Sequence, residues 1–129
     1  MGLNREIPAR DAGYQNIQYL RKDITFADAG PVVVGTLPAG AVIVKPISGV
    51  AVHTAFNNAT TNTLNIGTEA DGDFYATAIA TGAIAYVALD EAVSGKVDVD
   101  TTITATQAVS GAAATAGSAS VIIAYIPAN

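Results

Sequence analysis

From Lys22 onward, the chain consists of short segments rich in β-branched residues, bounded by glycine, proline, asparagine or aspartate. Such segments with turn residues between them are typical of a β-sandwich or barrel. In chain order they read KDITF, PVVVGTL, AVIVKP, SGVAVHTAF, NTLNIGT, AIAYVAL, KVDVDTTITAT and ASVIIAYI. A length of 129 residues fits one domain. We therefore predict a single all-β, antiparallel sandwich of about eight strands at residues 22–129, behind an extended N-terminal arm at residues 1–21.

Alternation along these segments predicts which side chains form the core. Val50, Val52 and Phe56 share one face of their segment. In residues 97–106 the odd positions are mainly apolar and include Val99, whereas the even positions are aspartate or threonine. The pattern predicts one buried and one solvated face for each of these strands.

Two segments, AIAYVAL and ASVIIAYI, carry apolar residues on both faces. A strand that is apolar on both faces is covered on both faces, by a second sheet or by another subunit. In a domain this small we expect a second subunit to supply the cover. The residues predicted for such an oligomer interface are Tyr86, Ile122 and Ile126.

Two alanine-rich stretches have weaker patterns. Residues 107–118, QAVSGAAATAGS, offer no large side chain for packing and are predicted to form a loop. Phe74 to Thr81 fits a strand or a loop, and it also fits a helical turn that begins at Asp73 and ends at Gly82. These alternatives stay open at this point.

The first 21 residues differ from the rest in charge and in their low content of β-branched residues. Asp11 can cap a short helix with Tyr14, Ile17 and Arg21 along one side, although so short a helix is marginal in isolation. We therefore expect the arm to become ordered against a partner. Most of the chain's positive charge lies in the arm and at its boundary: Arg5, Arg10, Arg21 and Lys22.

Composition argues against several function classes. The chain has no cysteine, so disulfides and thiolate metal sites are excluded. Its N-terminal sequence lacks the apolar core of a signal peptide, and no unbroken apolar stretch reaches the roughly 20 residues of a membrane helix. The body is acidic within a net charge of −5 and should repel phosphate backbones. We predict neither a membrane nor a nucleic-acid partner.

Motifs for catalysis and cofactor binding are missing from the sequence. His53 is the single histidine, and no G-x-S-x-G motif accompanies it. The glycine-rich phosphate-binding motifs are also absent. Asp98 and Asp100 fall on the solvated face of their segment, where paired acid–base chemistry has no apolar pocket to support it. We predict no catalytic residues, no cofactor and no enzymatic activity.

An acidic segment and three tyrosines remain as candidate binding residues. Glu69, Asp71 and Asp73 form E-x-D-G-D, which fits a turn but leaves a cation site open, since the remaining ligands of a calcium loop are missing. The tyrosines sit in or near predicted strands, where a ring more often packs in a core or interface than stacks on a sugar. They are Tyr75, Tyr86 and Tyr125.

Four stretches together resemble the small jelly-roll cement, or head decoration, proteins of tailed bacteriophages. In such proteins a turn of the L-P-A-G type leads into a strand, an N-I-G-like strand precedes an acidic turn, and an apolar strand ends the chain. The likeness covers residues 22–127. The matching stretches are TLPAGAVIV (36–44), VAVHTAFN (50–57), LNIGTEADGD (64–73) and AGSASVIIAYI (116–126).

The resemblance implies a jelly-roll sandwich that binds the major capsid protein on the outer capsid surface. It also implies a homodimer or homotrimer, assembled in the host cytoplasm. The alternative is a tail, fibre-base or receptor-binding β-module of a phage. On this resemblance, the residues of the capsid-contacting arm would be Arg5, Arg10, Tyr14, Arg21 and Lys22.

Overall fold

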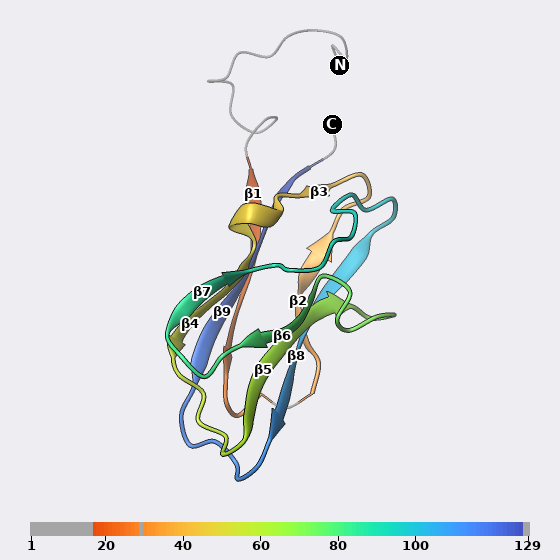
Figure 1. Cartoon of the computed structure of the whole chain (residues 1–129). Helices are drawn as coiled ribbons and strands as arrows, with labels where there is room; N and C mark the ends of the chain where they lie inside the picture. Colours follow the sequence, from red (N-terminus) through yellow and green to blue (C-terminus); the bar gives the residue numbers. More distant parts are fainter. Residues whose placement is uncertain (1–16, 29, 128–129) are drawn as a thin grey trace, which may run out of the picture.

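The computed structural model describes residues 17–28 and 30–127 of the chain. Across these residues it consists of strands and one short 3-10 turn, arranged as two facing antiparallel sheets (Figure 1). The elements are β1 (Gln18–Thr25), β2 (Val32–Leu37), β3 (Val42–Ile43), η1 (Lys45–Ile47), β4 (Gly49–Thr54), β5 (Thr61–Thr68), β6 (Ala76–Ala80), β7 (Ala85–Ala88), β8 (Thr101–Ser110) and β9 (Ser118–Ile126).

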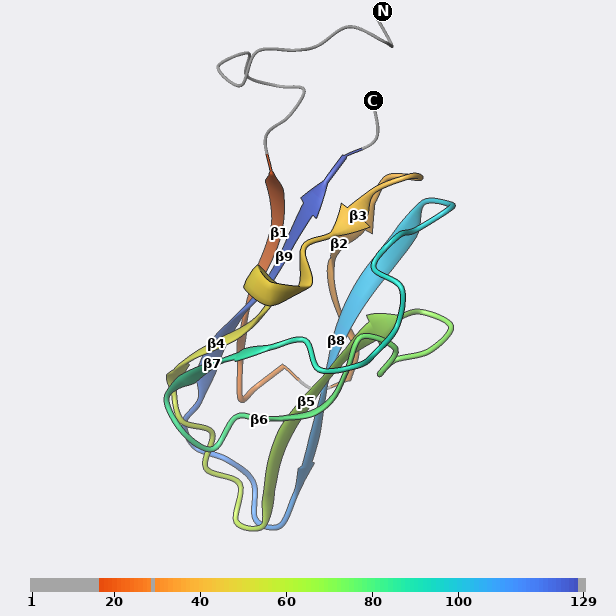
Figure 2. The same cartoon turned by 45° about the horizontal axis from the view of Figure 1, so that its top comes forward.

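One sheet is five-stranded, with the order β1-β9-β4-β7 and with β3 also paired to β9; the other has the order β2-β8-β5-β6. The chain crosses repeatedly between the two sheets, and its first and last strands are neighbours, as in a jelly roll. The start of β1 and the end of β9 therefore lie together at one end of the sandwich, beside β3 (Figures 1 and 2). The predicted all-β sandwich is confirmed.

The core lies between the inner faces of the two sheets. Val50, Val52 and Phe56 are buried there, as alternation predicts. Successive side chains in a strand point to opposite faces, so a regular strand contributes every second side chain, whereas β2 and β6 have register shifts and contribute side chains three residues apart. The fully buried residues from the other strands include Leu37, Leu64, Ile66, Ile103, Val121 and Ile123.

The first strand begins earlier than the sequence indicates. Residues 18–21, assigned to the arm from sequence, pair with β9 as part of the sheet. The helix expected around Ile17 and Arg21 is wrong for the described part, and Tyr14 lies outside the described residues. Leu20 packs against the core and Ile24 is buried within it. This burial in a strand stabilises residues 18–25 more than a short, marginally stable helix would.

The alanine-rich stretch is also a strand, so the helical-turn alternative is wrong. β6 pairs with β5, and its register shifts where Ala78 takes a φ of 56°. The side-chain oxygen of Asn65 accepts a hydrogen bond from the Ala78 N–H at 2.7 Å. The Ala78 N–H, which the bulge takes out of the hydrogen bonding between the strands, is paired in this way.

Two further boundaries differ from the predicted ones. β8 begins at Thr101, because residues 96–97 pair instead with the segment at Ala41 and Val42, and Val99 is exposed rather than buried. At its other end β8 continues to Ser110, so the predicted loop at residues 107–118 is reduced to residues 111–117. The Gln107 side chain helps to hold this part of β8 in place, since it donates hydrogen bonds to the carbonyl oxygens of Thr25 and Asp28.

Candidate functional site

The predicted interface residues all lie on the outer surface of the five-stranded sheet. In the ladders Tyr86 lies opposite Ala51, Ile122 opposite Gly49, and Ile126 opposite Val42, and alternation places all of them away from the core. Tyr19, opposite Ala124, lies on the same surface. We call this surface the β9 face; its outward-facing residues come from β1, β3, β4, β7 and β9.

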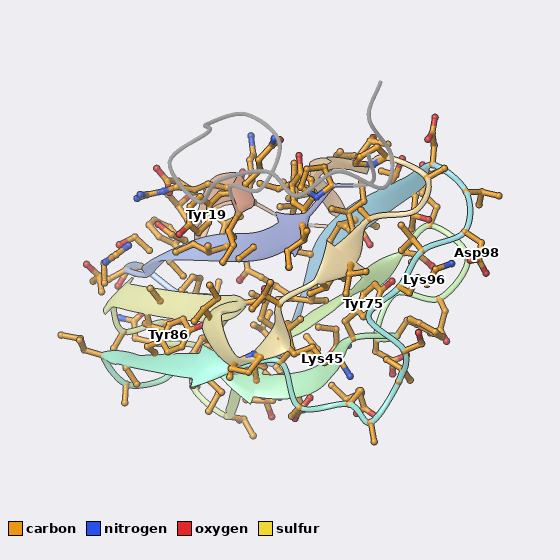
Figure 3. The ribbon with its side chains drawn as sticks, turned by 90° about the horizontal axis from the view of Figure 1, so that it is seen from above. Tyr19, Lys45, Tyr75, Tyr86, Lys96 and Asp98 are labelled. Atoms are coloured by element: carbon orange, nitrogen blue, oxygen red, sulfur yellow. The ribbon has the colours of Figure 1, made fainter. Side chains whose placement is uncertain are left out.

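The β9 face carries several exposed apolar side chains. Tyr19 is 62% exposed, Tyr86 49% and Ile126 45%, and Val42 is exposed beside Ile126. The two tyrosines lie toward one side of the molecule, away from the side that carries Lys96 and Asp98 (Figure 3). Partial burial raises the pKa of the Tyr86 phenol. The second apolar side of the β7 and β9 segments therefore lies on this face.

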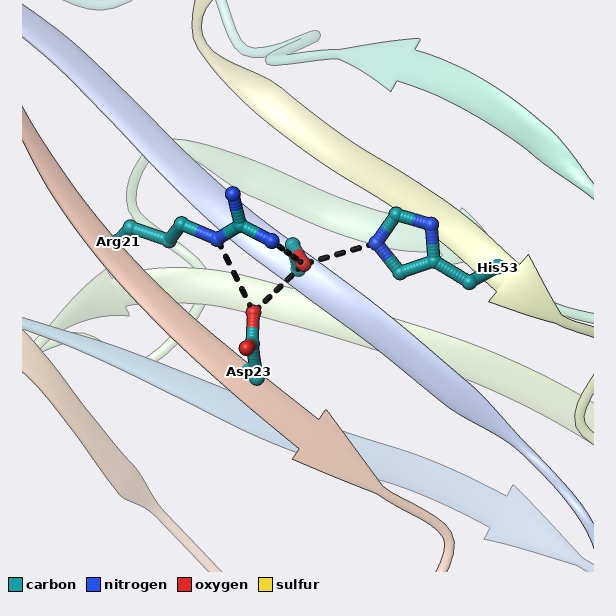
Figure 4. Close-up of polar contacts among 4 residues, drawn as sticks. Arg21, Asp23 and His53 are labelled. Carbon is teal, nitrogen blue, oxygen red and sulfur yellow. Dashed lines mark hydrogen bonds and ion pairs between the residues drawn. The ribbon is translucent and has the colours of Figure 1, made fainter.

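A polar cluster interrupts this apolar surface. Ser120 is only 1% exposed, and its Oγ lies 2.6 Å from Asp23 Oδ1, 2.8 Å from His53 Nε2 and 3.1 Å from Arg21 Nη2 (Figure 4). Arg21 Nε also pairs with Asp23 Oδ1 at 3.1 Å. The hydrogen bond from Ser120, followed by the Arg21 guanidinium, lowers the pKa of Asp23.

Sheet register and one bulge assemble the cluster. Asp23 lies directly opposite Ser120 in the β1–β9 ladder, and Arg21 precedes it on the same face. His53 occupies a bulge in β4, where the register against β9 shifts between Val52 and Thr54. The bulge turns the imidazole toward Ser120.

The cluster contains serine, histidine and aspartate, but its hydrogen bonds run the wrong way for a catalytic triad. A serine hydroxyl has one proton, and the short contact with the Asp23 carboxylate requires that proton to lie between Ser120 and Asp23. Ser120 therefore accepts hydrogen bonds from His53 and Arg21. A triad needs a histidine that accepts the serine proton and a carboxylate that orients the histidine. The cluster instead fixes β1, β9 and β4 to one another.

Replacing Ser120 with alanine is expected to raise the pKa of Asp23 toward the ordinary aspartate value, because the largest cause of its lowering is removed. Carboxyl-detected NMR titration of Asp23 measures this directly. Ser118→Ala is the matched control, since Ser118 lies on the same face of β9 opposite Thr25 and not opposite Asp23. An unchanged Asp23 titration in the Ser120→Ala protein would contradict the assigned direction of the hydrogen bond.

The lowered pKa of Asp23 also determines how its contribution to stability changes with pH. In the folded protein Asp23 stays ionised below the pKa of about 3.9 that it has in an unfolded chain. Its contribution to stability is therefore present above that value and is lost as the pH falls through the lower, folded-state pKa.

The acidic segment forms a turn. The Asp71 N–H donates to Thr68 Oγ1 at 3.1 Å, and the Thr68 N–H donates to the Asp71 carbonyl at 2.8 Å. A hydrogen bond with Asp71 and repulsion by its charge raise the pKa of Asp73. Among residues 17–28 and 30–127, no three acidic or histidine side chains, Glu69 included, come together as a metal site.

The remaining candidate residues have structural surroundings. Tyr75 and Tyr125 are buried in the core, so neither ring forms a stacking platform. Asp98 forms an exposed ion pair with Lys96, which lowers its pKa, and Asp100 accepts a hydrogen bond from the Ala39 N–H at 2.9 Å. Within the described part of the chain, no helix has the length and apolar character needed to cross a membrane.

The proposed arm residues divide between two regions. Arg5, Arg10 and Tyr14 lie outside the described residues. Arg21 belongs to the polar cluster on the β9 face. Lys22 lies in β1 opposite Val121, on the core side of an edge strand, but remains exposed. An inward-facing charge of this kind discourages unspecific pairing at a sheet edge.

The fold has counterparts in two solved phage structures. A chain of the capsid asymmetric unit of cyanophage Pam1 superposes with a TM-score of 0.68 at 21% identity, over 97% of this chain and 95% of its own length. A chain of the capsid of Ralstonia phage GP4 superposes with a TM-score of 0.60, also at 21% identity, over 97% of this chain and 92% of its own. No family model and no curated protein matches the sequence. At this level of identity the likeness establishes the fold.

Proposed function

We propose that the protein is a structural virion component of a tailed phage that binds the outer surface of the major capsid protein lattice and stabilises the head. The observation that carries the proposal is the superposition of nearly the whole chain on chains from two phage capsids. A partial match would indicate a shared module, whereas coverage above nine-tenths in both directions supports a protein of the same size and architecture.

The geometry of the most chemically suggestive residues agrees with a non-enzymatic role. In the Ser120 cluster the histidine donates to the serine, and the serine is buried beneath its partners. The exposed features are instead an apolar sheet face and an acidic set of loops, which suit contact with other protein chains. Both compared chains come from capsids, which favours this role over the tail, fibre-base or receptor-binding alternative.

In this proposal the protein acts as a small homo-oligomer assembled in the host cytoplasm. Its N-terminal arm lies along the capsid surface and is held there by Arg5, Arg10 and Tyr14, with Arg21 and Lys22 at its base. An arm that becomes ordered on docking offsets the lost conformational entropy with contacts made only in the complex.

Binding to capsids tests the function directly. Purified full-length protein is added to expanded capsids of its phage that lack it, and bound copies are counted by gel densitometry and cryo-electron microscopy. We expect saturable occupancy at positions set by the capsid symmetry and greater resistance of the heads to heat. Binding that does not saturate, or density without symmetry, would rule out a cement role. A competable signal on a glycan array would favour receptor binding instead.

Deleting residues 1–16 is expected to reduce capsid occupancy at least tenfold while the sandwich remains folded. The cut is placed before Gln18 because β1 begins there, and a longer deletion would remove Tyr19 and Leu20 from the sheet. Circular dichroism checks folding, and pelleting with capsids measures occupancy. The double substitution of Arg5 and Arg10 by glutamine separates the role of arm charge from that of arm length. Unchanged occupancy after the deletion would place capsid binding on the sandwich itself.

A further inference from the structure

We infer that Asp71 converts spontaneously to isoaspartate in the folded protein, through attack of the Gly72 main-chain nitrogen on its side chain. The turn between β5 and β6 is therefore a site of self-modification, independent of any capsid or partner protein. Asp71 is the only aspartate or asparagine of the chain that glycine follows. Because glycine has no side chain, nothing on residue 72 hinders the approach of its nitrogen to the carboxyl carbon.

The structure leaves both reacting groups of this turn accessible. The connection between β5 and β6 projects from the sandwich (Figure 1), and Asp71 and Gly72 are exposed in it. No heavy atom lies within 4 Å of a Cβ added at Gly72. Within residues 17–28 and 30–127, no acceptor takes the Gly72 N–H. Asp71 Oδ1 lies 3.4 Å from the Asp73 nitrogen, so the carboxyl group is folded forward over Gly72.

The main chain of the turn also activates the attacking nitrogen. That nitrogen must lose its proton, and the resulting negative charge is shared by resonance with the Asp71 carbonyl oxygen of the same peptide group. This oxygen accepts hydrogen bonds from the Thr68 N–H at 2.8 Å and from the Phe74 N–H at 3.3 Å. Donors held where negative charge develops stabilise that charge. The two donors therefore favour loss of the Gly72 proton.

A neighbouring carboxyl group prepares the one under attack. Asp71 must be protonated before one of its oxygens can leave as water. A hydrogen bond with Asp71 and repulsion by its charge, with a smaller repulsion from Glu91, raise the pKa of Asp73. Asp73 therefore holds a proton at a higher pH than an isolated aspartate would, and its hydrogen bond delivers that proton to Asp71.

The reaction needs no oxidant and no co-reactant other than water. The Gly72 nitrogen bonds to Asp71 Cγ, and the amide proton and the carboxyl hydroxyl leave as water, which closes a succinimide ring. Water then adds to the original Asp71 main-chain carbonyl carbon and breaks its bond to the Gly72 nitrogen. The product has the same mass and charge as before, but its main chain runs through Cγ and is longer by that carbon.

The turn has no room for the longer main chain. A Cβ added at Gly67 of β5 would overlap the Asp71 carbonyl oxygen, so the two segments already touch. Isoaspartate at residue 71 must therefore displace the turn from β5.

Peptide mapping of the full-length protein tests the inference. The folded chain is incubated for weeks at about pH 5, roughly one unit above the ordinary pKa of aspartate, and circular dichroism checks that it stays folded. Electron-transfer fragmentation of its peptides distinguishes isoaspartate from aspartate. Asp98 is the internal control, because its side chain is 83% exposed but the branched Val99 follows it. We expect isoaspartate at residue 71 to exceed that at residue 98 at least tenfold, and equal amounts would overturn the inference.

Two variants test the route of the reaction. Gly72→Ala keeps Asp71 and adds a Cβ that meets no neighbour, so it should slow the modification at least tenfold without unfolding the turn. An unchanged rate would rule out attack by this nitrogen. Gly49→Ala destabilises the sandwich far from the turn, and the rate at Asp71 should stay the same in it. A rate that rises in proportion to the unfolded population would place the reaction in the unfolded chain and overturn the inference.

Discussion

Replacement of Gly49 by alanine is expected to lower the free energy of unfolding by about 3 kcal/mol. Gly49 lies in β4 between β9 and β7, directly opposite Ala88 of β7. A Cβ added at this position would sit 2.8 Å from the Ala88 Cα and closer still to the carbonyl oxygen of Val87. These are backbone atoms, so no side chain can rotate away and the two strands must separate.

Urea unfolding followed by circular dichroism measures this effect. Gly72→Ala is the matched control, because no heavy atom lies within 4 Å of a Cβ added there. We expect its stability to remain within about 0.5 kcal/mol of the wild type. Equal stability of the Gly49→Ala protein would mean that β7 does not approach β4 as closely as the register requires.

Replacement of Tyr75 by alanine is expected to cost about 3 to 4 kcal/mol, in the range measured for large aromatic residues in protein cores. Tyr75 is 2% exposed and packs edge-on against Phe74, with the ring centroids 4.9 Å apart. Its loss would leave a cavity beside the turn that joins β5 to β6. Thermal and urea unfolding measure the loss.

Tyr75→Phe is the control because it keeps the ring and removes only the hydroxyl. We expect it to cost less than about 1.5 kcal/mol at neutral pH, as for other isosteric core substitutions. The two proteins should also differ at alkaline pH. Burial raises the pKa of the Tyr75 phenol in the folded protein. The contribution of the neutral phenol to stability is therefore complete below its unfolded-state pKa of about 10, and it is lost as the pH rises through the folded-state pKa. The phenylalanine variant should lose less stability there.

Alternation predicted the core well where a strand is covered on one side. Val50 and Val52 are buried because β4 faces the second sheet, and Phe56 is buried just beyond the end of β4. Val99 fails the same rule because the chain leaves the sheet before Thr101 and pairs with β3, a contact that no local pattern reveals. β6 was ambiguous for a related reason, since its alanines have weak strand preference and its geometry depends on the distant Asn65 side chain.

The candidate surface was predictable in part. Apolar residues on both sides of the β7 and β9 segments identified Tyr86, Ile122 and Ile126, and the structure places them on one face. The polar cluster on the same face was not predicted. Ser120 lies 97 residues from Asp23 and 67 residues from His53 in sequence, and only the strand order, with β9 between β1 and β4, brings them together.

The position of β9 also governs when this sheet can form during synthesis. Among the described strands of this sheet, β1 is hydrogen-bonded to β9 alone, so its pairing must wait until residues 118–126 have emerged from the ribosome. Such non-local pairing is slow to form. Nascent chains on one messenger RNA therefore lack the outer face of this sheet throughout most of translation. The β9 face is complete only after β9 has paired with β1 and β4.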